Sequence, residues 1–120
     1  MTLQQKQTLF AINVAKLINY IHATSAKSVT LGECFRTSEQ AELYAKSGKG
    51  IADSLHCKRL AIDINLFDLH TSKYLTDKSD YEDAGIYWKT LNSANRWGGD
   101  FVTLYHGKID DPNHFEMQDL

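Results

Sequence analysis

The spacing of hydrophobic residues predicts a long amphipathic helix over residues 3–24. Apolar side chains recur there at i, i+4, i+7, i+8 and i+11, which places them along one helix face. These side chains are Phe10, Val14, Leu17, Ile18 and Ile21. The polar face carries only Lys6 and Lys16, too little positive charge for a helix that binds a membrane surface. We therefore expect this helix to pack against the protein core.

Alternating hydrophobic and polar residues predict two principal strands, over residues 28–35 and residues 59–67. The second strand has the stronger pattern, with one apolar face formed by Ile62, Ile64 and Leu66. Successive side chains of a strand point to opposite faces, so Asp63 lies on the other face with Ala61 and Asn65. The pattern thus predicts a rigid strand that presents a carboxylate.

Shorter patterns complete the prediction. Thr37 or Ser38 is expected to cap a helix that runs to about Lys46, with Gln40 or Glu42 reaching back to the free amides. Other segments follow in chain order: a loop over residues 51–58, a hairpin strand over 71–75, a helix over 81–91, a turn-rich segment over 92–100, a strand or irregular segment over 101–105, and a final strand over 113–117. In that last strand His114 and Glu116 share one face.

Length and composition are those of one globular domain over residues 1–120, with 42% hydrophobic and 23% charged residues. The net charge is −2 and no long basic run occurs, so we expect no nucleic acid partner. No apolar run approaches the ~20 residues that span a bilayer, and we expect no stable membrane association. The first residues lack the apolar region of a signal peptide, so we expect synthesis in the cytosol without a cleaved signal. We also expect the protein to be a monomer.

Two cysteines, Cys34 and Cys57, are expected to be reduced thiols. Cys57 adjoins His56, so it is also considered as a metal ligand, although a fourth protein ligand would close a catalytic site. A disulfide between the two cysteines is a further alternative that the sequence leaves open.

Two stretches carry the candidate chemistry: Ser54-Leu-His56-Cys-Lys-Arg-Leu-Ala61-Ile-Asp63 and Asp111-Pro-Asn-His114-Phe-Glu116. They offer His56, Asp63 and His114 as ligands for one metal ion. Two imidazoles and one carboxylate leave a tetrahedral zinc ion with an open position for water. Asp111, a carboxylate outside this ligand set, is placed to accept the proton of that water.

These stretches resemble the LAS metallopeptidases, the D-Ala-D-Ala carboxypeptidase-like zinc peptidases of bacterial peptidoglycan. The family pattern is S-x-H-x-x-G-x-A-x-D followed by E-x-x-H. Ser54, His56, Ala61, Asp63 and His114 match this pattern, whereas Arg59 replaces the usual glycine and Asp111 the usual glutamate. Glycine at the position of Arg59 suggests a local turn with positive φ. The resemblance covers roughly residues 30–117.

The phage endolysin branch, with its L-alanyl-D-glutamate peptidases, is the most similar part of the family. Three segments carry this likeness: Arg36-Thr-Ser-Glu-Gln40, Trp97-Gly98-Gly99-Asp100 and Asp111-Pro-Asn-His114-Phe-Glu116. The resemblance implies an α+β fold, with a small antiparallel sheet packed with about three helices, as in D-Ala-D-Ala peptidases and hedgehog domains. It implies a single catalytic domain with bound Zn²⁺ and no cell-wall-binding module.

The resemblance also implies roles for the remaining site residues. Asp111 would be the general base, with Asp110 as its competitor, and Arg36 would hold the substrate or the oxyanion unless it forms an ordinary surface salt bridge. Ser54 would support the ligands rather than act as a nucleophile. Trp97 would wall the cleft or lie in the core, and Glu116 would orient an imidazole or face solvent.

The function implied is hydrolysis of peptidoglycan stem peptides for host lysis. The L-Ala–D-Glu bond is the first candidate, the terminal D-Ala–D-Ala bond of a carboxypeptidase or dipeptidase the second, and a cross-bridge the third. An endolysin would stay in the host cytoplasm until a holin, a functional and not a physical partner, gives it access to periplasmic peptidoglycan. The alternative to an enzyme is a hedgehog-like, zinc-bearing domain that binds partners without catalysis.

Overall fold

The computed structural model describes residues 1–48, 54–102 and 110–120. Three α-helices form: α1 (Leu3–Thr24), α2 (Ser38–Lys46) and α3 (Lys78–Leu91). The strands are β1 (Lys27–Leu31), β2 (Ala61–Asp68), β3 (Tyr74–Leu75), β4 (Asn95–Trp97) and β5 (His114–Met117). Two 3₁₀ turns, η1 (Leu55–Lys58) and η2 (Gly98–Asp100), precede β2 and follow β4. No helix in the described ranges is long and apolar enough to cross a membrane.

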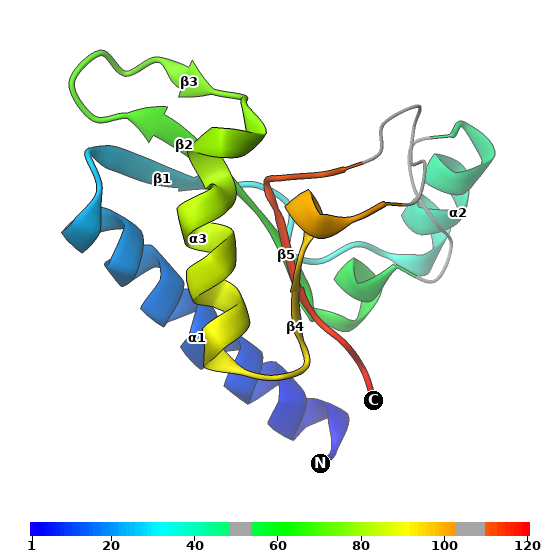
Figure 1. Ribbon diagram of the computed structural model, residues 1–120. Coiled ribbons are helices and arrows are strands. Elements are labelled where there is room, and N and C mark those ends of the chain that lie inside the picture. Colours follow the sequence, from blue (N-terminus) through cyan, green and yellow to red (C-terminus); the bar gives the residue numbers. More distant parts are fainter. Residues whose placement is uncertain (49–53, 103–109) are drawn as a thin grey trace.

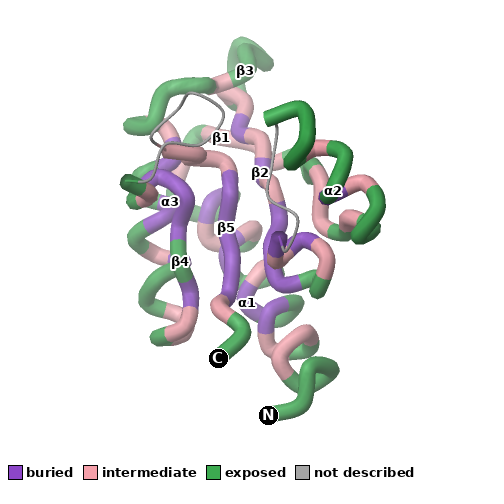
Figure 2. Tube along the Cα trace, turned by 90° about the vertical axis from the view of Figure 1, so that its right-hand side faces the viewer, coloured by how far each residue is buried: buried purple, intermediate pink, exposed green. Residues whose placement is uncertain are grey.

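The strands form one antiparallel sheet in the order β1-β2-β5-β4, with β3 paired to the far end of β2. Figure 1 shows α1 and α3 packed together on one side of this sheet, whereas α2 lies apart from both. Figure 2 shows β5 buried along its length, while most of α2 is exposed. Three helices and a small antiparallel sheet confirm the α+β fold that we predicted.

The core lies between the sheet and the helix pair. The apolar face predicted for β2, formed by Ile62, Ile64 and Leu66, is buried there. The buried helix side chains that meet it are Phe10, Leu17, Ile21, Tyr81 and Trp88. Trp88 contacts Phe10 and Phe115 edge-on at ring distances of 5.5 and 6.1 Å. Its indole N–H also donates to the carbonyls of Arg96 and Glu116, each at 3.1 Å. Trp88 therefore ties α3 to both β4 and β5, the strands that carry part of the site.

Several predicted boundaries need correction. The structure has a strand, β4, inside the segment expected to be turn-rich, because its three residues pair with β5. The helix expected from residue 81 begins at Lys78, because Asp77 is its N-cap and the Asp80 side chain in the first turn accepts a hydrogen bond from the Asp77 N–H at 3.1 Å. The hairpin strand is only two residues long, Tyr74–Leu75. Residues 101–102 are irregular, and the rest of that segment and the start of the 51–58 loop lie outside the described residues.

Candidate metal centre

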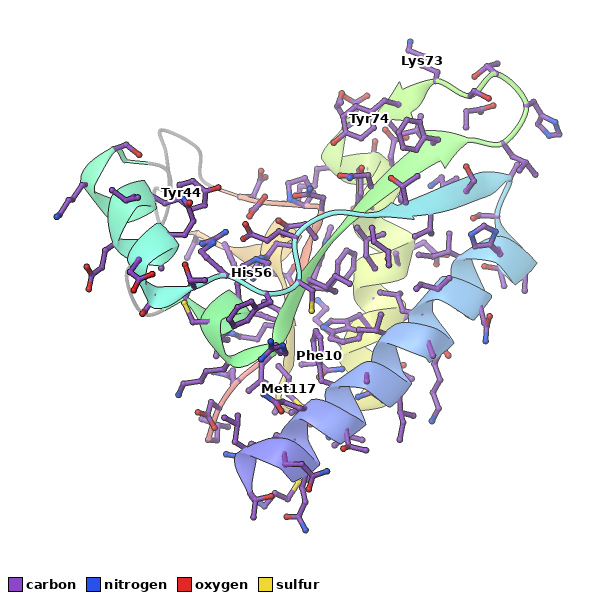
Figure 3. All side chains as sticks on the ribbon, turned by 180° about the vertical axis from the view of Figure 1, so that it is seen from behind. Phe10, Tyr44, His56, Lys73, Tyr74 and Met117 are labelled. Atoms are coloured by element: carbon purple, nitrogen blue, oxygen red, sulfur yellow. The ribbon has the colours of Figure 1, made fainter. Side chains whose placement is uncertain are left out.

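Three side chains that are far apart in the sequence converge on the face of the sheet opposite the core. His56 from η1, Asp63 from β2 and His114 from β5 each offer one ligand atom, and these atoms lie within 4.8 Å of one another. Asp63 Oδ1 is 3.5 Å from His56 Nε2 and 3.4 Å from His114 Nδ1. Figure 3 shows His56 far from the β3 hairpin, where Lys73 and Tyr74 lie. The structure thus brings together the three ligands that we predicted.

Strand register places two of these ligands side by side. Asp63 is directly opposite His114 in the antiparallel pairing of β2 with β5. On the other edge of β2, the Asp63 N–H donates to the Glu33 carbonyl at 2.9 Å, and the Gly32 N–H donates to the Asp63 carbonyl at 2.7 Å. Because Asp63 makes both its backbone hydrogen bonds on this edge and the next residue, Ile64, donates to the Asn113 carbonyl on the other edge, the Asp63 carboxylate is presented from a rigid element.

A single 3₁₀ turn places the third ligand. Ser54 begins η1, and its hydroxyl accepts a hydrogen bond from the His56 N–H at 3.2 Å. Arg59 ends the turn in the left-handed conformation, with φ of 54°. This conformation costs a residue with a Cβ roughly 1 kcal/mol. The Arg59 guanidinium lies 3.9 Å from the Phe35 ring centre, and this cation–π contact stabilises the turn by a similar free energy. The positive φ that glycine suggests at this position is therefore present here with arginine.

Outer partners determine which nitrogen of each imidazole faces the centre. His56 Nδ1 lies 3.1 Å from the Cys34 carbonyl, to which it donates as Nδ1–H, leaving Nε2 toward Asp63. His114 Nε2 lies 2.7 Å from Glu116 Oε1, leaving Nδ1 toward Asp63. Partners of this kind on the second ring nitrogen are typical of metal-binding histidines.

The charges of the site fit a bound cation. Asp63 Oδ1 is buried, and its nearest polar neighbours in the described ranges are the two ring nitrogens, at 3.4 Å from His114 and 3.5 Å from His56. Burial raises the pKa of Asp63, but hydrogen bonding and charge from His114 and His56 lower it by more, so that the pKa is about 2. Burial lowers the pKa of His114, but Asp63 and Glu116 raise it more, to about 9. Without a metal, a proton on His114 balances the carboxylates, and a metal ion bound by two imidazoles and a carboxylate would replace it.

The cysteines lie outside this group. In the described ranges, the side chains that gather within metal-binding distance are His56, Asp63 and His114, without Cys57. Cys57 Sγ lies 4.0 Å from the Thr37 carbonyl instead, and both Cys57 and Cys34 are free thiols. Within the described part of the chain, these three side chains would leave a tetrahedral zinc ion with one open position.

The two aspartates proposed as competing bases have different surroundings. The Asp111 N–H donates to the Gly98 carbonyl at 2.9 Å, and the Asp111 carbonyl accepts from the His114 N–H at 3.1 Å. Asp111 and His114 line the same cleft. Asp110 instead faces Lys78 of α3 at 3.7 Å, in a partly exposed ion pair. Asp111 thus lies in the cleft beside His114, and its role as the base stays a prediction.

Arg36 is held beside the site rather than at the open surface. Its Nε donates to Glu33 Oε1 at 2.6 Å, a terminal nitrogen contacts the same oxygen, and the guanidinium lies 4.9 Å from the Tyr44 ring centre. The side chain is only 10% exposed. The Arg36 N–H also donates to the His56 carbonyl at 3.2 Å. Arg36 therefore forms a partly buried ion pair next to a ligand segment, and its role toward substrate stays a prediction.

Trp97 belongs both to the core and to the cleft. It is 2% exposed, donates from its indole N–H to the Pro112 carbonyl at 2.7 Å, and packs closely against Gly85 and Gly99. It also lines a cleft of about 870 Å³ that opens beside His114. Charged and aromatic side chains form much of the cleft wall, among them Lys58, Lys89, Arg96, Asp100 and Phe101.

Two charged residues at the site were not identified from the sequence. Glu33 pairs with Arg36, and the spacing of three residues between opposite charges was the only sign of it. Arg96 pairs with the buried Glu116, which faces the His114 ring and not solvent. Arg96 adjoins Trp97 in the sequence, but only the pairing of β4 with β5 shows that it reaches Glu116.

Fold and site together define an α+β domain with a candidate His-Asp-His metal centre on one sheet face. No family model and no curated protein matches the sequence. Among solved structures, the chain is similar to the Serratia marcescens L-Ala D-Glu endopeptidase ChiX, with a TM-score of 0.68. The superposition covers 88% of this chain and 78% of that chain at 16% sequence identity. The likeness establishes a shared fold.

Proposed function

We propose that this protein is a zinc-dependent peptidase that hydrolyses peptidoglycan stem peptides. The observation that carries the proposal is the convergence of His56, Asp63 and His114, with both imidazoles oriented by outer partners, at the edge of a cleft. The shared fold with an L-Ala D-Glu endopeptidase supports the L-Ala–D-Glu bond as the first candidate.

Zinc, when bound by these three residues, supplies Lewis-acid activation of water and of the scissile carbonyl. Asp111 accepts the proton of the attacking water and returns it to the leaving amine. Arg36 contributes positive charge beside the ligand segment, where it stabilises charge that develops on the substrate. Ser54 keeps η1 in the conformation that points His56 at the centre.

The biological setting follows from the motif resemblance and is part of the proposal. As a phage endolysin, the protein would accumulate in the host cytoplasm and reach the peptidoglycan through a holin. Its cleft would then act on stem peptides without a stable partner.

Digestion of purified Gram-negative sacculi tests the proposed function. Zinc-loaded protein should generate new amino termini on D-Glu, detected by amine labelling and mass spectrometry, and a chelator should stop this hydrolysis. His114→Ala should abolish hydrolysis, because it removes a ligand, whereas His70→Ala, at an exposed loop position, should leave it unchanged.

The products distinguish the alternatives. Free D-Ala would indicate a carboxypeptidase or dipeptidase. New reducing ends without new amines would indicate a glycosidase and refute the proposal. A folded, zinc-bound protein that cuts neither peptide nor glycosidic bonds would be a binding domain of the hedgehog type.

A further inference from the structure

We propose that Arg96 is a positioning residue of the metal centre, acting through Glu116 to determine which nitrogen of His114 binds the metal. The inference rests on the metal site of the proposed function. Arg96 on β4 lies opposite Glu116 on β5, and Glu116 is two residues beyond the ligand His114 on the same strand. A continuous chain of charged contacts therefore runs from the cleft wall to a ligand.

The two oxygens of Glu116 have separate partners. Arg96 Nε donates to Oε2 at 2.7 Å, and a terminal guanidinium nitrogen contacts the same oxygen. The other oxygen, Oε1, accepts from His114 Nε2 at 2.7 Å. A carboxylate is planar, so holding Oε2 with two donors also fixes the direction of Oε1. Arg96 thereby sets the orientation of the acceptor that faces the imidazole.

Burial makes this arrangement sensitive to the loss of Arg96. Glu116 is 6% exposed, so its charge needs partners within the protein. The Arg96 side chain is 48% exposed and lines the cleft, and its guanidinium lies 5.8 Å from the Phe101 ring centre. Removing Arg96 would leave Glu116 free to turn or to admit water on Oε2, and His114 would lose its fixed acceptor.

The two imidazoles differ in their nearest outer partners. His56 Nδ1 lies 3.1 Å from the neutral Cys34 carbonyl, with the Glu33 carboxylate farther away at 3.9 Å, whereas His114 Nε2 lies 2.7 Å from the Glu116 carboxylate. A carboxylate partner increases the basicity of a ligating imidazole more than a carbonyl does. His114 is therefore the stronger donor of the pair, and Arg96 controls the strength of the whole centre through this one ring.

Zinc affinity, measured by competition with a chromophoric chelator, tests the inference. Glu116→Gln should weaken zinc binding by about 10–100-fold, the usual effect of losing an outer partner. Arg96→Gln should weaken it in the same direction, and Arg96→Lys should have an intermediate effect, because an ammonium keeps the charge without the paired donors. Lys89→Gln is the matched control, since Lys89 lines the same cleft and pairs with Asp100 at 2.5 Å.

A second measurement separates positioning from a general structural effect. In ¹⁵N spectra of the zinc-bound histidine rings, the wild-type protein should show metal on Nδ1 of His114 and a proton on Nε2. Arg96→Gln should broaden or divide the His114 signals while those of His56 stay unchanged. If Arg96→Gln does not fold, Arg96→Lys decides the question by its zinc affinity.

Wild-type zinc affinity and unchanged His114 signals in the Arg96 variants would overturn the inference. Failure of the wild-type protein to bind zinc would instead refute the proposed function, so the two failures are distinguishable. Loss of affinity in Lys89→Gln as large as in Arg96→Gln would also overturn it, because the effect would then be one of cleft charge.

Discussion

Gly98→Ala should displace Asp111, because the two backbones approach too closely to admit a side chain. A Cβ at residue 98 would lie 1.9 Å from the Asp111 carbonyl oxygen and 3.0 Å from His114 Cβ. The nearest atoms belong to the backbone, so no side-chain rotation relieves the clash. The Asp111 N–H also donates to the Gly98 carbonyl at 2.9 Å, which holds the two segments together.

The geometry sets the size of the effect. Close carbon–oxygen contacts in proteins are about 3.3–3.6 Å, so one segment must move by roughly 1.5 Å. Overpacking of this kind costs about 1–3 kcal/mol, and in a domain of this size each kcal/mol lowers Tm by roughly 3–5 °C. A displacement of about 1 Å in a catalytic group costs on the order of 10²-fold in rate.

Thermal unfolding, zinc affinity and turnover on sacculi should be measured together. Gly48→Ala is the matched control, because its φ is +77° and no atom of the described residues lies within 4 Å of an added Cβ. That variant should lose about 1 kcal/mol of stability through backbone strain and keep full turnover. Wild-type Tm for Gly98→Ala would refute the packing argument, whereas lower Tm with unchanged turnover would exclude Asp111 from the chemistry.

Five further outcomes are expected. Asp111→Asn should keep fold and zinc but lose about 10²–10⁴-fold in turnover, while Asp110→Asn should change little; the reverse order would assign the base to Asp110. Because the metal-free pKa of His114 is raised to about 9, zinc must displace its proton, and zinc affinity should rise about tenfold per pH unit from neutrality to about pH 9. In the metal-free protein, the stability that this proton contributes is complete below about pH 6.5 and is lost as pH rises through about 9, a loss that urea unfolding at stepped pH would detect. Arg59→Gly should change the free energy of unfolding by less than about 1 kcal/mol, since relief of the positive φ offsets a lost ring contact; a loss above about 2 kcal/mol in urea unfolding contradicts this. Arg36→Lys should lower turnover more than it lowers Tm, because an ammonium cannot reproduce the guanidinium fork; normal turnover would leave Arg36 as a structural ion pair.

Local patterns in the sequence were enough to predict the elements that depend on near neighbours. The helix predicted over residues 3–24 has those bounds, and Thr37 caps the helix that follows β1, with its hydroxyl accepting from the Gln40 N–H. The apolar face of β2 is buried as expected, so Asp63 points away from the core. Side-chain periodicity and capping act over a few residues, and for this reason they can be recognised without the tertiary structure.

The ligand set was also predictable, because its residues form short motifs with fixed spacing. The sequence by itself therefore gave rise to the His-Asp-His group as a hypothesis, and its resemblance to a known family implied the fold class.

Only the tertiary structure decided how that group is built. The register that sets Asp63 opposite His114, the short strand β4, and the contact of Arg96 with Glu116 all join segments that are distant in the chain. The orientation of each imidazole likewise depends on a partner, the Cys34 carbonyl or the Glu116 carboxylate, whose position follows from strand pairing. Pairing register is a property of the whole sheet, so no local pattern specifies it.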